Sequence, residues 1–431
     1  MSSGRRSSLS ATLVAALFCT ATLSVIAADW PQWRGLERDG RSTEAIRRDW
    51  DANPPAHLWT VEGMGRGYAS VAVVDGRLYT VGNRDNAQCI ICVDAESGRP
   101  IWSSKITDSV PRHDYEGSRS TPTVDGDKIY AVSSDGGIAC LNLADGSPVW
   151  RRSFRDFGGQ LMSGWGFSEG PLVDGDNVIC TPGGPNAVMV ALNKATGKDV
   201  WRCAMPRAEA RGRDGAGYSS IVVSNAGGVK QYVQTVGHGV IGVRARDGKF
   251  LWGYDKVAND VANIPTPLVS GDHVFASTGY GAGAALLKLN KAGDGIRPEE
   301  VYFLQANVFQ NHHGGMVLDG DVVYAGHGHG QGFPTCLNWR TGKVVWGGSR
   351  QRGPGEGSAA LTQVGDGLLF RYQNGVLALI DASPQGYKLL GTLTPDYQEG
   401  DSWSHPVVVN GKMYLREQDR LMCYDVSASG N

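Results

Sequence analysis

The sequence predicts an all-β fold: an eight-bladed β-propeller of four-stranded antiparallel blades, with an N-terminal strand that closes the last blade. Glycine accounts for 60 of the 431 residues, which indicates a chain that turns often. A unit of four short apolar runs recurs along the chain, and its clearest copy covers residues 120–150. Successive units lie 44 to 51 residues apart, and four strands at that period are typical of propeller blades.

Turn-forming pairs divide each unit into strands. In the clearest copy, Asp125-Gly126 separates the first two apolar runs and Asp145-Gly146 separates the last two. Such pairs supply the positive φ angles that two-residue hairpins require, so each unit is predicted to be an antiparallel meander. Equivalent pairs recur at Asp75-Gly76, Asp174-Gly175, Ser270-Gly271, Asp319-Gly320 and Asn410-Gly411, and in the second position at Ser97-Gly98, Thr196-Gly197, Asp247-Gly248 and Thr341-Gly342.

A large aromatic residue marks the end of most fourth strands. A residue type that repeats once per blade is expected to pack between blades rather than to bind a cofactor. Trp102, Trp150, Trp201, Trp252 and Trp346 occupy this position, and Tyr302 and Leu390 are expected to fill it in two blades that lack the tryptophan.

The last unit ends after three strands, near Asp425. Its missing outer strand is predicted at residues 56–61, because Trp59 gives this segment the pattern of the other fourth strands. This pairing closes the ring and leaves no blade incomplete. The predicted domains are an extension over residues 28–55, a propeller over residues 56–427 and a tail over residues 428–431.

Residues 1–27 have the pattern of a signal peptide. Arg5 and Arg6 precede an apolar run, and Val25-Ile26-Ala27 offers a cleavage site before Ala28. An uncleaved anchor is the alternative, but serine and threonine residues dilute the run. The protein is therefore predicted to be periplasmic or secreted, with no transmembrane span in the mature chain.

Charge and cysteine spacing argue against two other classes of protein. The chain has 41 Lys and Arg against 43 Asp and Glu, a net charge of −2, and no basic block, so nucleic acid is not an expected partner. Cys89 and Cys92 lie three apart on a predicted strand and face opposite sides, which argues against a zinc or redox motif. The cysteines at one repeated position are expected to pack in the core without disulfides: Cys92, Cys140, Cys336 and Cys423.

The irregular loops indicate where a binding site is expected. Both sets of turns fall on one rim of the propeller, so the other rim carries the loops between second and third strands and the long links between blades. Binding groups concentrate on such loops, and seven of the nine histidines lie in or beside them. Each candidate alone is more often a hydrogen-bonded loop residue than a ligand contact. The candidates at the channel mouth are Arg119, Trp165, Glu169, His238, Asn263, Asn311, His312, His313, Glu356, Trp403 and His405.

The sixth unit concentrates histidines. His312 and His313 precede its inner strand, and His327 and His329 lie in its own loop between glycines. Imidazole nitrogens suit zinc, copper or iron, so these four residues are candidate ligands of a transition metal. Histidines that only hydrogen-bond to loop backbone are the competing interpretation. A further ligand would come from Asn311, His238, His405 or a carboxylate.

Several motifs resemble a known family. Thr-Gly-Lys-x-x-Trp, at residues 196–201 and 341–346, resembles the tryptophan-docking motif of eight-bladed quinoprotein propellers. That family includes pyrroloquinoline quinone (PQQ) dehydrogenases and BamB-type outer-membrane assembly factors, and the resemblance covers most of the chain. Residues 29–35, Asn311-His312-His313-Gly314-Gly315 and residues 402–406 are similar to secreted, planctomycete-type PQQ-binding-like repeat proteins, some of which are described as polyvinyl-alcohol dehydrogenases.

The resemblance implies two alternative functions. One is a non-catalytic, BamB-like binding or scaffold module in the cell envelope; the other is a PQQ-dependent alcohol dehydrogenase of the polyvinyl-alcohol type. The sequence favours the first, because it has no adjacent cysteine pair, no carboxylate at residues 183–186 and no carboxylate cluster with the spacing of a calcium site. The sequence shows no nucleophile–base pair of the kind that would indicate a hydrolase. A protein or small-molecule ligand is expected at the loop rim, PQQ or a transition metal is the candidate cofactor, and oligomeric state is left open.

Overall fold

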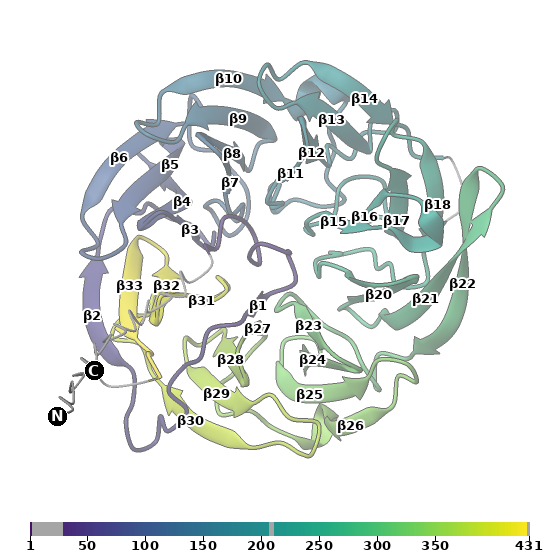
Figure 1. Cartoon of the computed structure of the whole chain (residues 1–431). Helices are drawn as coiled ribbons and strands as arrows, with labels where there is room; N and C mark the ends of the chain where they lie inside the picture. The colour runs from purple at the N-terminus through teal and green to yellow at the C-terminus, as the bar shows by residue number, and fades with distance from the viewer. Residues whose placement is uncertain (2–28, 207–210, 429–431) are drawn as a thin grey trace.

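The computed structural model describes residue 1, residues 29–206 and residues 211–428. These ranges form eight blades of four antiparallel strands around a central axis (Figure 1), one of which carries a fifth, parallel strand, and this confirms the predicted fold class. The predicted signal peptide beyond residue 1 and residues 429–431 lie outside the described residues. Within the described part, no helix has the length and apolar character needed to cross a bilayer.

The strands of each blade follow one another from the channel to the outside (Figure 1). Blade one contains β3 (Ala72–Val74), β4 (Arg77–Arg84), β5 (Ala87–Asp94) and β6 (Pro100–Lys105). Blade two contains β7 (Thr123–Asp125), β8 (Lys128–Val132), β9 (Gly137–Asn142) and β10 (Pro148–Ser153). Blade three contains β11 (Leu172–Asp174), β12 (Asn177–Cys180), β13 (Met189–Asn193) and β14 (Asp199–Cys203). Blade four contains β15 (Val222–Ser224), β16 (Gln231–Val236), β17 (Gly239–Arg244) and β18 (Phe250–Tyr254).

The second half of the ring repeats this order. Blade five contains β19 (Leu268–Ser270), β20 (His273–Thr278), β21 (Gly283–Ala292) and β22 (Gly295–Leu304). Blade six contains β23 (Met316–Asp319), β24 (Val322–His327), β25 (Phe333–Asn338) and β26 (Val344–Gly347). Blade seven contains β27 (Ala359–Val364), β28 (Gly367–Tyr372), β29 (Leu377–Asp381) and β30 (Leu389–Leu393), and blade eight contains β31 (Val407–Val409), β32 (Lys412–Glu417), β33 (Arg420–Asp425) and β2 (Ala56–Val61). Short 3₁₀ turns occur at η1 (Phe154–Phe157), η2 (Ala226–Gly228) and η3 (Gly348–Arg350).

The N-terminal strand closes the ring as predicted. β2 pairs antiparallel with β33, and Trp59 lies opposite Cys423. Blade one has the same register, with Trp102 opposite Cys92. The outer strand of blade eight therefore comes from the start of the propeller, and its three inner strands come from the end.

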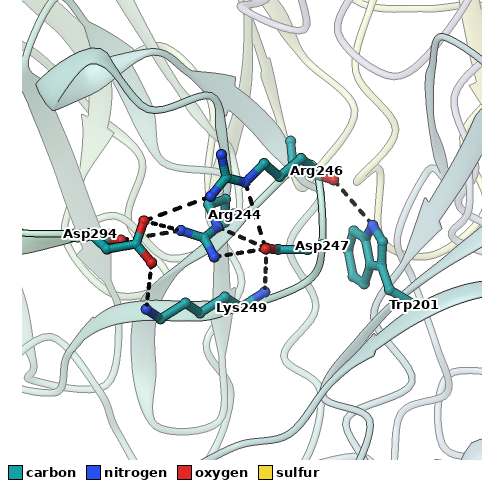
Figure 2. A network of polar contacts seen from close by, with 7 residues as sticks. Trp201, Arg244, Arg246, Asp247, Lys249 and Asp294 are labelled. Carbon is teal, nitrogen blue, oxygen red and sulfur yellow. Dashed lines mark hydrogen bonds and ion pairs between the residues drawn. The ribbon is translucent and has the colours of Figure 1, made fainter.

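Aromatic rings join neighbouring blades. The indole of Trp201 lies over Gly248 of blade four, where an added Cβ would be 2.5 Å from ring atom Cε3. Its Nε1 donates a hydrogen bond to the carbonyl oxygen of Ala245 at 3.1 Å (Figure 2). Glycine is required at this turn because the residue has a φ of 72° and the ring leaves no room for a side chain. Trp59, Trp102 and Trp150 lie in the same way on Gly98, Gly146 and Gly197 of the next blade.

Paired charges connect blades four and five at the same turn (Figure 2). Arg244 lies 2.7 Å from a carboxylate oxygen of Asp247 and 2.8 Å from one of Asp294, and Lys249 lies 3.1 Å from Asp294. Hydrogen bonds from Arg244 lower the pKa of Asp247 to about 2. The two carboxylates in turn raise the pKa of the Arg244 guanidinium above its ordinary value. Arg246 also lies near both carboxylates, so three cations share two carboxylates, and the cluster braces the rim that carries the hairpin turns.

The prediction for blade seven was wrong by one residue. Gly391, rather than Leu390, lies opposite Leu379 at the position that tryptophan occupies in other blades. Leu390 is the bulged residue that the register skips, as Ile101 is in blade one. The aromatic ring at this position comes instead from Trp50 of the N-terminal extension, which is 1% exposed and packs in the core shared by blades seven and eight.

The extension crosses the centre of the ring, where it appears dark purple in Figure 1. Its strand β1 (Arg41–Ser42) pairs in parallel with β27 of blade seven. Arg41 forms an ion pair with Asp319, and Glu44 accepts hydrogen bonds from the backbone of the Asn410-Gly411 turn. These contacts place the extension on the rim of the hairpin turns, so it covers that end of the channel.

Buried side chains fix the extension to the propeller. Trp30 and Trp33 pack on it: Trp30 is 5% exposed and exchanges two backbone hydrogen bonds with Val73, while Trp33 Nε1 donates to Thr266 Oγ1 at 3.3 Å. Arg38 donates to the carbonyl oxygens of Gly170 and Ile221, both at 2.7 Å, and thereby ties blade three to blade four. The crossing is therefore specified by hydrogen bonds to inner-strand backbone.

The cysteines of the described part pack in the core. Seven thiols, at Cys89, Cys92, Cys140, Cys180, Cys203, Cys336 and Cys423, are all buried and unbridged. Burial raises the pKa of each of them, and raises those of Cys92 and Cys140 to about 11, so the thiols stay protonated at neutral pH.

Candidate binding pocket in the central channel

A cavity of about 220 Å³ lies at the loop rim of the channel. Trp33 and Arg34 of the extension line this cavity. Because the extension lies across the other end of the channel, these two residues form the floor of the cavity. Residues from the loop rim make up the rest of the lining: Tyr68, Tyr115, Arg119, Trp165, Ser168, Tyr218, Ser220, Ile264, Pro265, Thr266, Tyr280, His312, His313, Gly315, Trp403 and His405. The cavity is thus a blind pocket built mainly from aromatic rings, imidazoles and two arginines.

Six of the predicted site residues come together in this pocket. They are Arg119, Trp165, His312, His313, Trp403 and His405. They come from the links that lead into different blades, as expected for residues near the inner strands. The structure therefore has a cavity at the mouth where the site was predicted. That these six residues contact a ligand stays a prediction.

Two glycines position the histidines of blade six. A Cβ at Gly314 would lie 1.5 Å from the carbonyl oxygen of Ala359, and one at Gly315 would lie 2.3 Å from Arg34 Nη1. Gly315 also has a φ of 74°, which side-chain-bearing residues rarely adopt. The link can therefore pass between blade seven and the extension only because both residues lack a side chain.

The imidazoles around the pocket are neutral at ordinary pH. Burial and the neighbouring imidazoles lower the pKa of His312 to about 2 and that of His313 to about 3. The His312 ring is held by Ser358 Oγ at 2.7 Å and by the Tyr280 hydroxyl at 3.2 Å. Burial and the positive charge of Arg34 lower the pKa of His405 to about 3. These groups therefore present hydrogen-bonding, uncharged surfaces to a ligand.

The four candidate metal ligands do not converge. The ring centres of His313 and His329 each lie 4.1 Å from that of His312. His327 is turned away: its ring stacks on Phe309, and its Nδ1 accepts the backbone N–H of Gln310 at 3.3 Å. In the part of the chain that the structure describes, no group of three or more His, Cys, Asp or Glu side chains is placed to hold a metal ion.

The remaining predicted residues lie outside the pocket lining. Glu169, Asn263 and Asn311 are buried; for example, Asn263 Nδ2 donates to the carbonyl oxygens of Val236 and Gly237, both at 2.9 Å. His238 hydrogen-bonds to Asp214 and to the carbonyl oxygen of Arg211. Glu356 is exposed in the link before β27. These residues shape the loops around the mouth.

Glu169 is a buried carboxyl group. It is 4% exposed, and its Oε1 accepts the backbone N–H of Thr181 at 2.6 Å. Burial raises its pKa to about 7, although the hydrogen bond and the charge of Arg38 act in the opposite direction. This residue therefore titrates near neutral pH without facing the pocket.

Sequence reasoning missed the contribution of the extension and of the tyrosines. Trp33 and Arg34 stand in the N-terminal extension, which the sequence predicts as a segment before the propeller and for which it indicates no path across the channel. Tyr115 and Tyr280 line the pocket with φ angles of 52° and 55°, a strained conformation for bulky residues. No signal in a single sequence identifies such tyrosines, because they belong to loops of irregular length.

PQQ with its calcium ion is a poor match to this lining. A calcium site needs six or more oxygen ligands, several of them charged. None of the described residues that line the pocket carries a carboxyl group. No step of the proposed function is therefore assigned to that pair.

The fold and the pocket define an eight-bladed propeller whose channel holds a blind pocket at the loop rim. The chain belongs to the family described as outer membrane protein assembly factor BamB, whose model matches residues 48–161 and 90–348. It is 32% identical over 113 residues to the BamB protein of Xanthomonas campestris pv. campestris, and 25% identical over 118 residues to that of Burkholderia pseudomallei. These matches span 25% and 27% of the length of the two relatives.

Solved structures share the fold at low sequence identity. BamB from Moraxella catarrhalis superposes with a TM-score of 0.61 at 14% identity, over 88% of this chain and 99% of that one. Quinohemoprotein alcohol dehydrogenase from Comamonas testosteroni superposes with a TM-score of 0.64 at 14% identity, over 95% and 82% of the two chains. A europium-containing methanol dehydrogenase gives 0.64 at 12% identity, over 90% and 89%. The propeller is therefore common to assembly factors and dehydrogenases, and fold alone does not choose between them.

Proposed function

We propose that this protein is an exported, non-catalytic binding module that takes a ligand into the pocket at the loop rim of its channel. The observation that carries this proposal is the composition of the pocket. Aromatic rings and neutral imidazoles bind organic surfaces, whereas general acid–base catalysis uses a group that titrates near the working pH. The imidazoles of His312 and His313 are far from that range, and no lining residue carries a carboxyl group.

Ser358 and His312 resemble a nucleophile–base pair, but their surroundings support the same conclusion. Ser358 Oγ lies 2.7 Å from His312 Nδ1, but Ser358 is 3% exposed and does not line the pocket. The other ring nitrogen of His312 contacts a tyrosine hydroxyl rather than a carboxylate. An imidazole with a pKa of about 2 is also a very weak base. The pair therefore holds the loop rather than activating a nucleophile.

The sequence and the family support the proposed export and the proposed class of partner. Residues 1–27 have the pattern of a cleaved signal peptide, which supports a periplasmic or secreted location. The family description names assembly of outer membrane proteins, which supports a role as a scaffold for other proteins in the cell envelope. In this proposal the loop rim is the binding face, because the extension covers the opposite rim.

Binding in the pocket can be tested with a variant that fills it. Flat organic probes, both charged and neutral, would be titrated into the full mature chain by calorimetry. Ile264→Trp places an indole in the lining, and Val261→Trp adds the same group to a side chain that is 39% exposed and lies outside the lining. At least one probe is expected to bind the parent protein and Val261→Trp but not Ile264→Trp. Equal binding to both variants would contradict a pocket site.

A second assay tests the non-catalytic assignment. The protein would be incubated with PQQ and Ca²⁺ and then given alcohols and a dye acceptor. No dye reduction above that of protein-free controls is expected. Dye reduction that depends on PQQ would replace this proposal with the dehydrogenase alternative.

A further inference from the structure

We propose that the pocket is an organic-anion site, and that the N-terminal extension supplies its charged floor: Arg34, together with Arg119 of the loop rim, binds the carboxylate of a ligand whose flat body packs between the aromatic rings. This inference rests on the proposed function, because it specifies the ligand of the same pocket. It adds the chemical class of the ligand and a role for the extension.

Arg34 is a buried cation that forms no ion pair among the described residues. Its side chain belongs to a residue that is 3% exposed, and Nη2 donates to the carbonyl oxygens of Met316 and Asp39. Nη1 makes no hydrogen bond, and the group forms no ion pair with a described residue, although the nearby charge of Asp39 favours its charged form. Burial lowers the pKa of Arg34 only to about 10, so it keeps its charge at neutral pH. An unpaired buried charge is costly, and an anion in the pocket would relieve that cost.

Arg119 adds a second positive charge on the loop side. Its guanidinium donates to the carbonyl oxygens of Trp165 at 2.6 Å and Tyr115 at 2.7 Å, and it lies 5.2 Å from the centre of the Tyr68 ring. As with Arg34, its partners among the described residues are neutral. With neutral imidazoles and no lining carboxylate, the pocket has a net positive charge. A cationic ligand is therefore disfavoured and an anionic ligand is favoured.

The aromatic walls indicate a flat body behind the anionic group. Trp403 lies 4.7 Å from Tyr68 and 5.1 Å from Tyr115, measured between ring centres, and Trp165 lies 5.7 Å from Tyr218. Trp403 Nε1 is a covered donor that makes no hydrogen bond. Aromatic faces bind the faces of other rings and of sugars. The unpaired indole N–H can donate a hydrogen bond to an acceptor on the ligand.

Backbone strain is concentrated at the same place. Arg34, Tyr115 and Tyr280 have φ angles of 62°, 52° and 55°, and all three residues line the pocket. Residues with side chains rarely hold such angles unless the surroundings impose them, and they cluster at ligand sites. The strained positions thus support a preorganised site.

The extension and the site are linked. Arg34 reaches the pocket only because Gly315 has no side chain, and it arrives there only when the extension lies across the channel. A ligand held by Arg34 stabilises the seated extension, and by thermodynamic reciprocity the seated extension raises the affinity for the ligand.

The test compares matched acids and neutral analogues on the full mature chain. Calorimetry would measure 2-naphthoate against 2-naphthamide, and glucuronate against glucose, so that the two arms distinguish an aromatic acid from a sugar acid. The variants are Arg34→Met and Arg34→Lys, with Arg41→Met as the control that removes a positive charge from the same extension outside the pocket. Hydrogen exchange over residues 29–42 would report on the seated extension.

At least one acid is expected to bind about tenfold or more tightly than its neutral analogue, and to slow exchange in residues 29–42. Arg34→Met should abolish the preference, Arg34→Lys should restore part of it, and Arg41→Met should leave it unchanged. If Arg34→Met does not fold, Arg119→Met carries the same comparison. Equal binding of acid and neutral analogue would overturn the anion site while leaving a binding pocket, and a preference that survives both arginine variants would overturn it too. Absence of binding by every probe would overturn the proposed function as well.

Discussion

Trp50 packs directly against Gly391, with the Trp50 Cβ 2.6 Å from the point where a Cβ of Gly391 would lie. Blade seven has no tryptophan of its own at this position, and the extension provides one. The contact shows why glycine stands there: any side chain would displace the backbone of residues 50 and 51. The extension is therefore part of the propeller core at blade seven, in addition to covering the channel.

Trp50→Ala is expected to lower the free energy of unfolding by about 3 to 5 kcal/mol, because it empties a fully buried aromatic site. Urea denaturation followed by tryptophan fluorescence or circular dichroism would measure the change. Leu36→Ala, in the same extension but 60% exposed, is the control and should change stability by less than about 0.5 kcal/mol. Equal effects of the two substitutions would contradict a core role for Trp50.

The Arg38 guanidinium is expected to be irreplaceable. Arg38→Met removes the donors to Gly170, Pro171 and Ile221 and leaves buried carbonyl groups unpaired, so the free energy of unfolding should fall by at least about 2 kcal/mol. Arg38→Lys should not restore it, since a single ammonium cannot reproduce the planar fork that spans two blades.

Chemical denaturation of these variants beside Arg41→Met provides the comparison. Arg41 forms a surface ion pair with Asp319, and losing it should cost no more than about 1 kcal/mol. A lysine variant as stable as the parent protein would show that charge, rather than the forked geometry, holds the extension.

Most of the fold could be predicted because each repeat unit carries the same structural signals. The turn pairs, the strand spacing and the tryptophan position each recur from blade to blade, so an error in one unit is corrected by the others. Where the repeat breaks, prediction lost its basis: Leu390 was assigned the tryptophan position because nothing in the sequence marks the bulge that puts Gly391 there. The partner of that glycine, Trp50, lies outside the repeat.

The candidate site could be predicted only in part for a related reason. His312, His313, Trp403 and His405 were found because they stand at the same place relative to their inner strands. Arg34 was missed, because its place in the pocket depends on how an irregular segment crosses the ring. That path is set by long-range hydrogen bonds to inner-strand carbonyls, and backbone carbonyls carry no sequence signature.

Strand β2, which closes blade eight, is expected to stabilise the propeller although most of its side chains are exposed. Deleting Ala56–Val61 leaves β33 without its outer neighbour and is expected to lower the melting temperature markedly. Within the strand, Trp59→Ala removes the ring that covers Gly98 of blade one and should destabilise by about 3 kcal/mol. The adjacent Leu58→Ala, at a side chain that is 45% exposed, is the matched control. A melting curve unchanged by the deletion would refute closure of the ring by this strand.

Glu169 gives the protein a predicted pH dependence. Its pKa is raised from 4.5 to about 7 in the folded protein, chiefly by burial, so the folded state holds the proton more tightly than the unfolded state. Between these two pH values the folded state binds more protons, and its stability therefore falls as the pH rises. Above pH 7 the full penalty applies, about 3 kcal/mol by the conversion of pKa shift to free energy.

Glu169→Gln keeps the size of the side chain and cannot ionise, so it should match the parent protein near pH 4 and exceed its stability by up to about 3 kcal/mol near pH 8. Urea denaturation of both proteins at several pH values gives the difference curve, with its midpoint inside this range. Glu356→Gln, at an exposed position, is the control that makes the same chemical change outside the core. Two outcomes would contradict this prediction: a difference in stability that does not change with pH, or a Glu169→Gln variant that loses stability relative to the parent as the pH rises. Either would show that Glu169 is ionised in the folded protein and paired more strongly than its burial implies.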